Sequence, residues 1–239
     1  MRNTTIAGAV FLIALAVTST LSCNSFADFG KIHEGKIVYA IEYPKEEGQT
    51  SLVSLLPETM EMKFKDNNTV INISGFMKVF NLIYVSNFKT RTNYSLFRIM
   101  NQKMMYKADF SEYPFGYKTM QNLKLTYTDD TLTICGYKCK KILAECPEES
   151  AQPFELYYTN DINIKSPNTN TPYKSIDAVL MGFQVRLNNI NMKMRAIEVV
   201  KEDVSDEEFK IPDDYQSVSR AELEEFVDSY MNVGPSTGR

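Results

Sequence analysis

The stretch Glu34-Gly35-Lys36-Ile37-Val38-Tyr39-Ala40-Ile41-Glu42-Tyr43 sets the pattern that most of the chain follows. Every second residue from Ile37 to Tyr43 is isoleucine or tyrosine, so an extended chain places these side chains on one face. Pro44 and the turn-forming segment Lys45–Thr50 end the run. The stretch therefore predicts a β-strand that buries one face.

The same alternation recurs along the chain. Met60, Met62 and Phe64 alternate with charged residues, whereas Phe76–Val85 is apolar on both sides, which is typical of a strand covered on both faces. The longest loop is Ser166–Tyr173. Further strands are expected at Val70–Ile73, Thr92–Met100, Met104–Asp109, Leu123–Thr128, Lys138–Glu145, Phe154–Thr159, Gly182–Leu187 and Met192–Val200. No strand–helix–strand spacing is present, so we predict a mainly β (α+β) fold, a curved antiparallel sheet or half-barrel of roughly ten strands.

One helix is marked near the end of the chain. Ser219-Arg220-Ala221-Glu222 is a capping box, in which serine and glutamate satisfy free backbone amides reciprocally. An apolar stripe at helical spacing follows, made of Leu223, Phe226, Val227 and Tyr230. We expect a C-terminal helix that packs on an open face of the sheet, followed by a disordered tail over residues 232–239.

The first residues are typical of a signal peptide. The apolar run Ile6–Val17 follows a single basic residue, Arg2, and is shorter than the roughly 20 residues of a spanning helix. Two cleavage sites fit: after Ala27, which releases a free protein, or before Cys23, which would then carry a lipid anchor on a membrane surface. The leading Leu21 lies one place later than in the usual lipidation motif, and both alternatives stay open. We predict a signal peptide over residues 1–27 and a single domain over 28–231.

The charge distribution argues against a nucleic acid partner. The formal net charge is −4 with a pI near 5.3, and acids and bases are well mixed along the chain. No basic stripe or cluster of aromatic and arginine residues is present.

Three cysteines remain after either cleavage. Cys135 and Cys139 flank Gly136-Tyr137-Lys138, a three-residue hairpin loop across which two Cβ atoms come within bonding reach. Cys146 lies too far along an extended strand to bond Cys139, at about 3.3 Å per residue. We expect a Cys135–Cys139 disulfide, with three buried free thiols as the alternative.

No arrangement of residues indicates catalysis. The single histidine, His33, lies near the start of the mature chain, where an oriented imidazole is not expected. The carboxylate pairs Asp129-Asp130 and Asp213-Asp214 have the chemistry of turns. Zinc would need two ligands beyond Cys135 and Cys139, and no glycine-rich phosphate loop exists. We therefore expect no catalytic residues, no metal and no cofactor.

Several phrases, taken in order, resemble a family of exported proteins of unknown function from Gram-negative bacteria with a LolA/LolB-like fold. These are the first strand quoted above, Gly136-Tyr137-Lys138-Cys139-Lys140-Lys141, Tyr157-Tyr158-Thr159-Asn160-Asp161-Ile162 and Phe209-Lys210-Ile211-Pro212-Asp213-Asp214-Tyr215. A related exported family carries Gly-Leu-Pro-Gly-Leu-Ile where this chain departs with Ala178-Val179-Leu180-Met181-Gly182-Phe183. The resemblance implies a half-barrel over an apolar cavity, a place in the periplasm or outer membrane, and no catalytic residues.

Flexible apolar side chains on the strand faces suggest a ligand for such a cavity. Methionine-rich surfaces accept varied apolar ligands, and each buried CH₂ contributes about 0.8 kcal/mol. The candidate lining is Met60, Met62, Phe64, Phe80, Leu82, Met104, Phe183, Met192 and Met194. The resulting hypothesis is a non-enzymatic envelope protein that binds a hydrophobic small molecule, lipid or lipidated protein. The alternative is a structural or protein–protein interaction module of the cell envelope, whose core is filled by these same residues.

Overall fold

The computed structural model describes residues 31–44, 56–75, 80–147, 152–187 and 190–231. These residues form one large sheet, one α-helix and two 3₁₀ turns, Lys118–Met120 and Asp206–Phe209. The elements are β1 (Glu34–Glu42), β2 (Thr59–Lys65), β3 (Asn68–Ser74), β4 (Phe80–Asn87), β5 (Thr92–Ile99), β6 (Gln102–Asp109), β7 (Lys124–Ile134), β8 (Tyr137–Glu145), β9 (Phe154–Thr159), β10 (Val179–Leu187), β11 (Ile190–Val200), β12 (Gln216–Ser217) and α1 (Arg220–Met231). The mainly β fold with a C-terminal helix is confirmed, with twelve strands rather than about ten.

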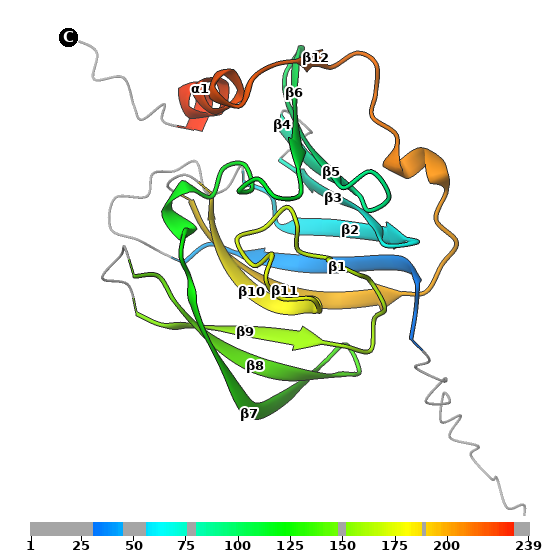
Figure 1. The fold of residues 1–239 in the computed structure, drawn as a ribbon, viewed down its shortest axis with the longest axis vertical. Coiled ribbons are helices and arrows are strands. Elements are labelled where there is room, and N and C mark those ends of the chain that lie inside the picture. Colours follow the sequence, from blue (N-terminus) through cyan, green and yellow to red (C-terminus); the bar gives the residue numbers. More distant parts are fainter. Residues whose placement is uncertain (1–30, 45–55, 76–79, 148–151, 188–189, 232–239) are drawn as a thin grey trace, which may run out of the picture.

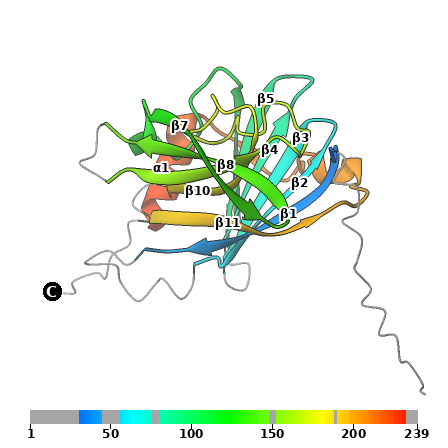
Figure 2. The same cartoon turned by 90° about the horizontal axis from the view of Figure 1, so that it is seen from below.

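The twelve strands form an open sheet in the order β12-β6-β5-β4-β3-β2-β1-β11-β10-β9-β8-β7. All neighbours are antiparallel except β12 and β6, which are parallel. The strands β1 to β6 form one meander and β7 to β11 form another. The first strand of the first meander, β1, pairs with the last strand of the second, β11, in the middle of the sheet (Figure 1). The sheet bends, so that β3 to β5 rise at an angle to β10 and β11 (Figure 2). The two halves therefore turn their inner faces towards a common core.

The main core lies on this inner face and follows the alternation seen in the sequence. Ile37 and Tyr39 are at most 2% exposed, and Tyr39 Oη donates a hydrogen bond of 2.9 Å to the carbonyl of Leu180. The pairing of β1 with β11 contains a bulge after Val38, and the extra β11 residue, Ile197, is 57% exposed. The hydrogen-bond acceptor of the buried Tyr39 is a carbonyl group of β10, a strand that lies far from β1 in sequence.

The long loop between β9 and β10 folds inwards rather than over the surface. Asn168 Nδ2 donates hydrogen bonds to the carbonyls of Ile176 (2.6 Å) and Ala178 (2.9 Å). Thr169 Oγ1 donates to Asn93 Oδ1 at 3.0 Å on the inner face of β5. Asn168 and Thr169 are each 5% exposed, so this loop fills part of the space that the bent sheet encloses.

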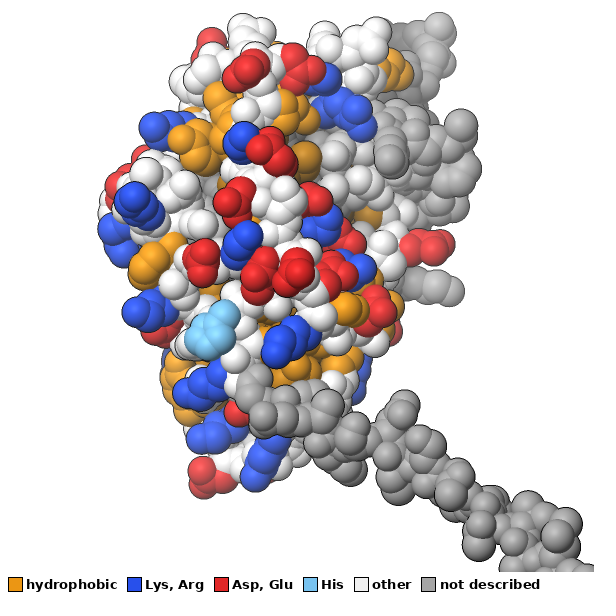
Figure 3. Space-filling model, turned by 90° about the vertical axis from the view of Figure 1, so that its right-hand side faces the viewer, with side chains coloured by type: hydrophobic (Ala, Val, Ile, Leu, Met, Phe, Trp, Pro, Cys, Tyr) orange, Lys and Arg blue, Asp and Glu red, His pale blue; other side chains and the backbone are white. Residues whose placement is uncertain are grey.

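The opposite, outer face of β3 to β6 carries a second, smaller core. Val70, Val85 and Leu96 form its centre, and residues 201–215, which we call the strap, cross over them (Figure 1). The strap contributes Phe209, Ile211 and Tyr215. Figure 3 faces the side on which the strap lies and shows Lys and Arg side chains intermixed with Asp and Glu side chains.

Ion pairs anchor the strap to β2. Lys63 Nζ lies 2.8 Å from Glu208 Oε1, and Lys65 Nζ lies 2.8 Å from Asp206 Oδ1. Hydrogen bonds to these partners raise the pKa of both lysines. Because these pairs are open to solvent, they orient the strap more than they stabilise it.

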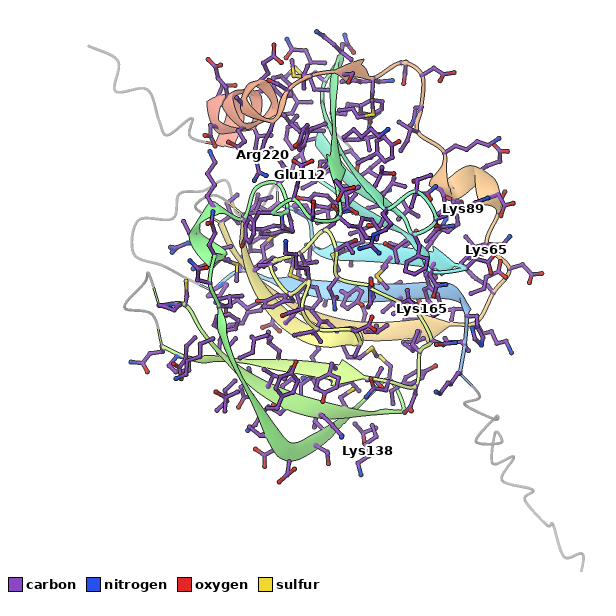
Figure 4. The ribbon with its side chains drawn as sticks, in the orientation of Figure 1. Lys65, Lys89, Glu112, Lys138, Lys165 and Arg220 are labelled. Atoms are coloured by element: carbon purple, nitrogen blue, oxygen red, sulfur yellow. The ribbon has the colours of Figure 1, made fainter. Side chains whose placement is uncertain are left out.

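The helix begins as the capping box predicts. The amide of Glu222 donates to Ser219 Oγ (3.3 Å), and the amide of Ser219 donates to Glu222 Oε2 (2.7 Å). Leu223 is fully buried. The Phe226 ring contacts the Phe97 ring of β5 edge-on, and the two ring centres lie 5.8 Å apart. Arg220 Nη1 donates to the carbonyl of Tyr113 at 2.7 Å, and Figure 4 shows Arg220 close to Glu112 beneath the helix.

Candidate functional site

The nine residues proposed from sequence to line a hydrophobic site lie together on the inner face. Seven belong to the main core, while Phe80 and Met104 pack against it. They are Met60, Met62, Phe64, Phe80, Leu82, Met104, Phe183, Met192 and Met194. The shared face that the alternation predicts is therefore present, and the contacts of these side chains are with one another and with the rest of the core.

Two hollows on this face are very small. One lies between Met60, Phe183 and Asn168, and the other between Phe80 and Met192. Each has a volume of about 20 Å³, which is close to the space that one water molecule needs and far below that of an acyl chain. The loop from β9 to β10 accounts for part of this filling, because its Asn168 lines the first hollow.

A larger groove lies on the outer face of the neighbouring strands β9, β10, β11 and β1. Its volume is about 560 Å³. The polar side chains that line it are Glu42, Glu155, Tyr157, Gln184, Lys193 and Arg195. We call this the outer groove.

Strand register explains why these side chains meet. Gly182 pairs with Tyr157 on one side and with Arg195 on the other, and Gln184 pairs with Lys193. Residues opposite each other in adjacent strands have Cβ atoms about 5 Å apart, so the outward positions of three strands form one continuous surface. Glu42, which pairs with Lys193, extends this surface onto β1.

A glycine opens the floor of the outer groove. A Cβ atom at Gly182 would lie 3.3 Å from Cδ2 of Tyr157, which is a tight contact. Because glycine has no side chain, the Tyr157 ring lies over the backbone of β10 beside the groove.

A hydrogen bond and a nearby positive charge hold the Glu155 carboxylate of the outer groove in place. Tyr157 Oη donates to Glu155 Oε2 at 2.6 Å, and Lys141 Nζ lies 3.5 Å from Glu155 Oε1. The hydrogen bond from Tyr157, together with the charge of Lys141, lowers the pKa of Glu155. Glu155 is therefore an anionic acceptor at neutral pH, and it raises the pKa of Tyr157 in return.

The outer groove offers both donors and acceptors beside an aromatic ring. Carboxylates accept hydrogen bonds, lysine and arginine donate them, and the carboxamide of Gln184 does both. Such a surface suits a neutral ligand rich in hydroxyl and amide groups. Sequence analysis did not identify it, because the convergence of these outward residues depends on the pairing of strands far apart in sequence.

The described cysteines lie in the turn of the β7–β8 hairpin, on β8 and just after β8. All three described cysteines, Cys135, Cys139 and Cys146, are free thiols. Ile134 pairs with Tyr137, so the hairpin turn consists of two residues, Cys135 (φ 50°) and Gly136 (φ 82°). Cys139 pairs instead with Leu132, and burial raises the pKa of its thiol to about 11. The three-residue loop expected from sequence is wrong, because positive φ values at both positions make the tighter turn.

The remaining candidates for chemistry are dispersed. His33 lies just before β1, and one of its ring nitrogens lies 2.9 Å from Asn163 Nδ2. Asp130 is paired with Lys141 at 2.5 Å, and Asp214 is paired with Lys103. Among the described residues, no three histidine, cysteine or acidic side chains converge as metal ligands would.

The predicted leader, with Cys23 and both cleavage sites, and the predicted tail over 232–239 lie outside the described residues. In the part of the chain that is described, no helix has the length and apolar character needed to cross a membrane.

The fold and the outer groove define a mainly β domain with a solvent-accessible polar site. Residues 80–223 match the model of a family described as N-glycanase peptide, N-terminal domain, which is the N-terminal domain of PNGase F-II. This match takes in more than half of the sequence, from β4 into α1, and the chain belongs to this family.

Solved structures of PNGF-II are similar to the chain. One, in space group P21, has a TM-score of 0.52 and 13% identity, and the match covers 82% of this chain and 33% of that one. Another, in space group C2, has a TM-score of 0.49 and 14% identity, with coverages of 81% and 32%. The chain thus spans about a third of the length of these PNGF-II chains, and at such identities the first likeness shows the fold alone. No curated protein matches the sequence.

Family membership overturns the resemblance to LolA/LolB-like exported proteins. The functions that rested on it are also wrong, namely a lipid-binding envelope protein or lipoprotein and its envelope-module alternative. The short phrases misled because they encode local structure. Gly136-Tyr137-Lys138 contains half of a two-residue turn, and Tyr157-Tyr158-Thr159 is a strand end, features that many antiparallel sheets share.

Proposed function

We propose that this chain is a non-catalytic module that binds glycoproteins and holds the glycan-bearing part of the ligand in the outer groove. The observation that carries the proposal is the convergence of Tyr157, Glu155, Gln184, Lys193 and Arg195 around this groove in a chain of an N-glycanase family. An N-glycanase acts on N-linked glycans, and a domain that accompanies such an enzyme has use for a site that recognises them.

The chemistry of the outer groove suits a glycan. Sugar hydroxyl groups donate and accept hydrogen bonds, while the carbon–hydrogen faces of sugar rings are apolar. Glu155 and Glu42 supply acceptors, Lys193 and Arg195 supply donors, and the Tyr157 ring supplies an apolar face. The volume of about 560 Å³ lies within the usual range for small-ligand sites.

The electrostatics support binding without catalysis. Hydrolysis by paired carboxyl groups needs one that stays protonated near neutral pH. Glu155, the carboxyl group next to Tyr157, has a lowered pKa and is a poor proton donor. We therefore propose that any glycan cleavage is carried out by a separate domain or protein, and that this chain contributes affinity.

Binding to one protein in two glycosylation states tests the proposal. The purified domain is immobilised and titrated with a protein carrying N-linked glycans, and then with the same protein after its glycans are removed. We expect saturable binding only to the glycosylated form. Tyr157→Ala should weaken binding tenfold or more, because an aromatic residue at the centre of a contact contributes about 2 kcal/mol.

Tyr127→Ala is the matched control, since Tyr127 is 57% exposed on β7 and does not line the outer groove. Equal binding to both glycosylation states, or equal losses in the two tyrosine variants, would refute the glycan site. Release of free glycan from a glycopeptide by the purified chain would refute the non-catalytic part.

We also propose that the domain acts outside the cytoplasm, on the support of the apolar leader Ile6–Val17. Mass spectrometry of the protein isolated from its native cells tests this. A mature chain starting at Cys23 or at Asp28 is expected, and an uncleaved chain would contradict export.

A further inference from the structure

Two cationic side chains of the outer groove take no part in ion pairs among the described residues. Lys193 and Arg195 are exposed residues two positions apart on β11, so both point outwards into the groove. Neither forms an ion pair with another described side chain. Lys141, beside the groove, lies instead 2.5 Å from an oxygen atom of Asp130 and 3.5 Å from one of Glu155. The two cations on β11 therefore remain as donors for a ligand.

Strand register separates Arg195 from other polar side chains more completely than Lys193. Arg195 pairs with Gly182 of β10 on one side and with Ala40 of β1 on the other. Neither of these residues has a polar side chain. Lys193, in contrast, pairs with Glu42 of β1. Because residues directly opposite each other in adjacent strands are the ones whose side chains meet, the guanidinium group of Arg195 has no acceptor directly across either strand.

The aromatic ring of the outer groove lies on the same surface as Arg195. Tyr157 pairs with Gly182 from the opposite side. Adjacent strands lie about 4.8 Å apart, so the backbones of β9 and β11 are roughly 10 Å apart across β10. The charge of Arg195 acts against the rise in pKa that Glu155 causes at Tyr157, so the guanidinium group is within electrostatic reach of this hydroxyl group. A ligand that lies over β10 can therefore contact the ring on one side and the guanidinium group on the other.

The acidic residues of the groove favour a ligand group with a single negative charge. Glu42 and Glu155 both line the groove, and Glu155 is ionised at neutral pH because its pKa is lowered. Like charges repel, so every additional negative charge on a ligand is opposed by these carboxylates. A phosphate ester carries about 1.5 to 2 negative charges at neutral pH and is therefore a poorer match than a carboxylate.

We infer that the outer groove selects glycans that carry a sialic acid, a sugar with one carboxylate and one acetamido group. The planar guanidinium group of Arg195 binds the carboxylate through two parallel hydrogen bonds. The carbon–hydrogen face of the sugar packs on the Tyr157 ring, and the carboxamide of Gln184 bonds to the acetamido group. Apart from this one carboxylate the ligand is neutral, in keeping with the mixed donors and acceptors of the groove. The inference rests on the proposed function, since it names the sugar by which the groove distinguishes one glycan from another.

Three forms of one glycoprotein separate this inference from the proposed function. The full chain is immobilised and titrated with a glycoprotein whose N-linked glycans end in sialic acid, with the same protein after sialidase treatment, and with the same protein after removal of all glycans. We expect the sialidase-treated form to bind about tenfold more weakly than the sialylated form, and still more tightly than the glycan-free form. Equal binding of the first two forms, with none by the third, would overturn the inference and leave the proposed function intact. Equal binding of all three forms would refute both.

A substitution at Arg195 tests which residue contacts the carboxylate. Arg195→Gln removes the charge and keeps a hydrogen-bond donor. It should weaken binding of the sialylated form about tenfold and that of the sialidase-treated form by no more than about twofold, because only the first supplies a carboxylate. The matched control is Lys138→Gln, which removes the same charge from an exposed position of β8 outside the groove (Figure 4) and should change neither value. Equal losses for both glycoprotein forms in Arg195→Gln would overturn the inference.

Competition with free sugars tests the same recognition without a substitution. N-acetylneuraminate should displace the sialylated glycoprotein from the unchanged chain. Galactose, which is neutral, glucuronate, which has a carboxylate but no acetamido group, and inorganic sulfate, a simple anion, should each require about tenfold higher concentrations. Displacement by any of these three at the concentration that suffices for N-acetylneuraminate would contradict selection of a sialic acid.

Discussion

Asn168→Ala tests whether the loop between β9 and β10 fills the interior of the sheet. Asn168 is 5% exposed, and its Nδ2 group satisfies two carbonyl groups, those of Ile176 and Ala178. The substitution removes both hydrogen bonds and leaves both carbonyl groups buried. A buried acceptor without a partner costs about 1–3 kcal/mol, so the free energy of unfolding should fall by about 2–4 kcal/mol.

Urea unfolding followed by circular dichroism measures this change, and calorimetry measures the midpoint. In a domain of this size each kcal/mol lowers the midpoint by roughly 2–4 °C, so we expect a decrease of about 5–15 °C. A dye that reports exposed apolar surface should also bind the variant more strongly, because the loop covers Met60 and Phe183.

The matched control is Asn163→Ala, which lies in the same connection and is bonded to His33 at the surface. Its effect should be within about 0.5 kcal/mol of the unchanged protein. If Asn168→Ala and Asn163→Ala had equal and small effects, the loop would not be held by its buried asparagine. The filled interior would then lose its main physical support.

Two further predictions concern the helix cap and the acid limit of stability. Ser219→Ala should lower the free energy of unfolding by about 1 kcal/mol in a urea titration, whereas the exposed Ser217→Ala should not; equal effects would contradict the observed cap. The hydrogen bond from Tyr106 lowers the pKa of Glu112, so its stabilising effect is present above the ordinary glutamate value near 4.3 and is lost as the pH falls through the lowered one. Thermal midpoints measured from pH 6 to pH 3 should therefore decrease more in the unchanged protein than in Glu112→Gln, and parallel curves would show that this interaction is not formed.

Local pattern was enough to predict the strands and the helix. The alternation from Ile37 to Tyr43 and from Met60 to Phe64 requires only that one face of a strand is buried, and period two follows from backbone geometry. The capping box at Ser219 and Glu222 likewise depends on residues three positions apart. Features of this kind can be predicted from sequence because all their determinants lie within a few residues.

Strand order could not be predicted, and the candidate sites depend on it. Tyr157, Gly182 and Arg195 are adjacent because β9, β10 and β11 pair in a particular register, with a bulge between Leu180 and Gly182. The period-two pattern of Met192–Arg195 shows that two residues point outwards but not which strands flank them. A shift of one residue would turn every outward side chain inwards, so no site residue can be inferred without the pairing.

The long loop and the hairpin at Cys135 show a second limit. A segment rich in asparagine, threonine and proline has the composition of a surface loop, yet Asn168 and Thr169 are buried because Asn93 and the backbone satisfy their polar groups. At the hairpin, the choice between a two-residue and a three-residue turn depends on backbone angles at Cys135 and Gly136. Both outcomes depend on partners or angles that composition does not specify.

The composition of the outer face explains where the strap covers the sheet and where the outer groove lies. On β3 to β5 the outward residues include Val70, Val85 and Leu96, and a sheet that is apolar on both faces needs a cover on each, which the strap provides. On β10 and β11 the outward side chains at the groove, Gln184, Lys193 and Arg195, are polar, so that part of the sheet is stable in contact with solvent and its surface stays open as the outer groove. The covered and the open parts of the outer face therefore both follow from where apolar residues stop along it.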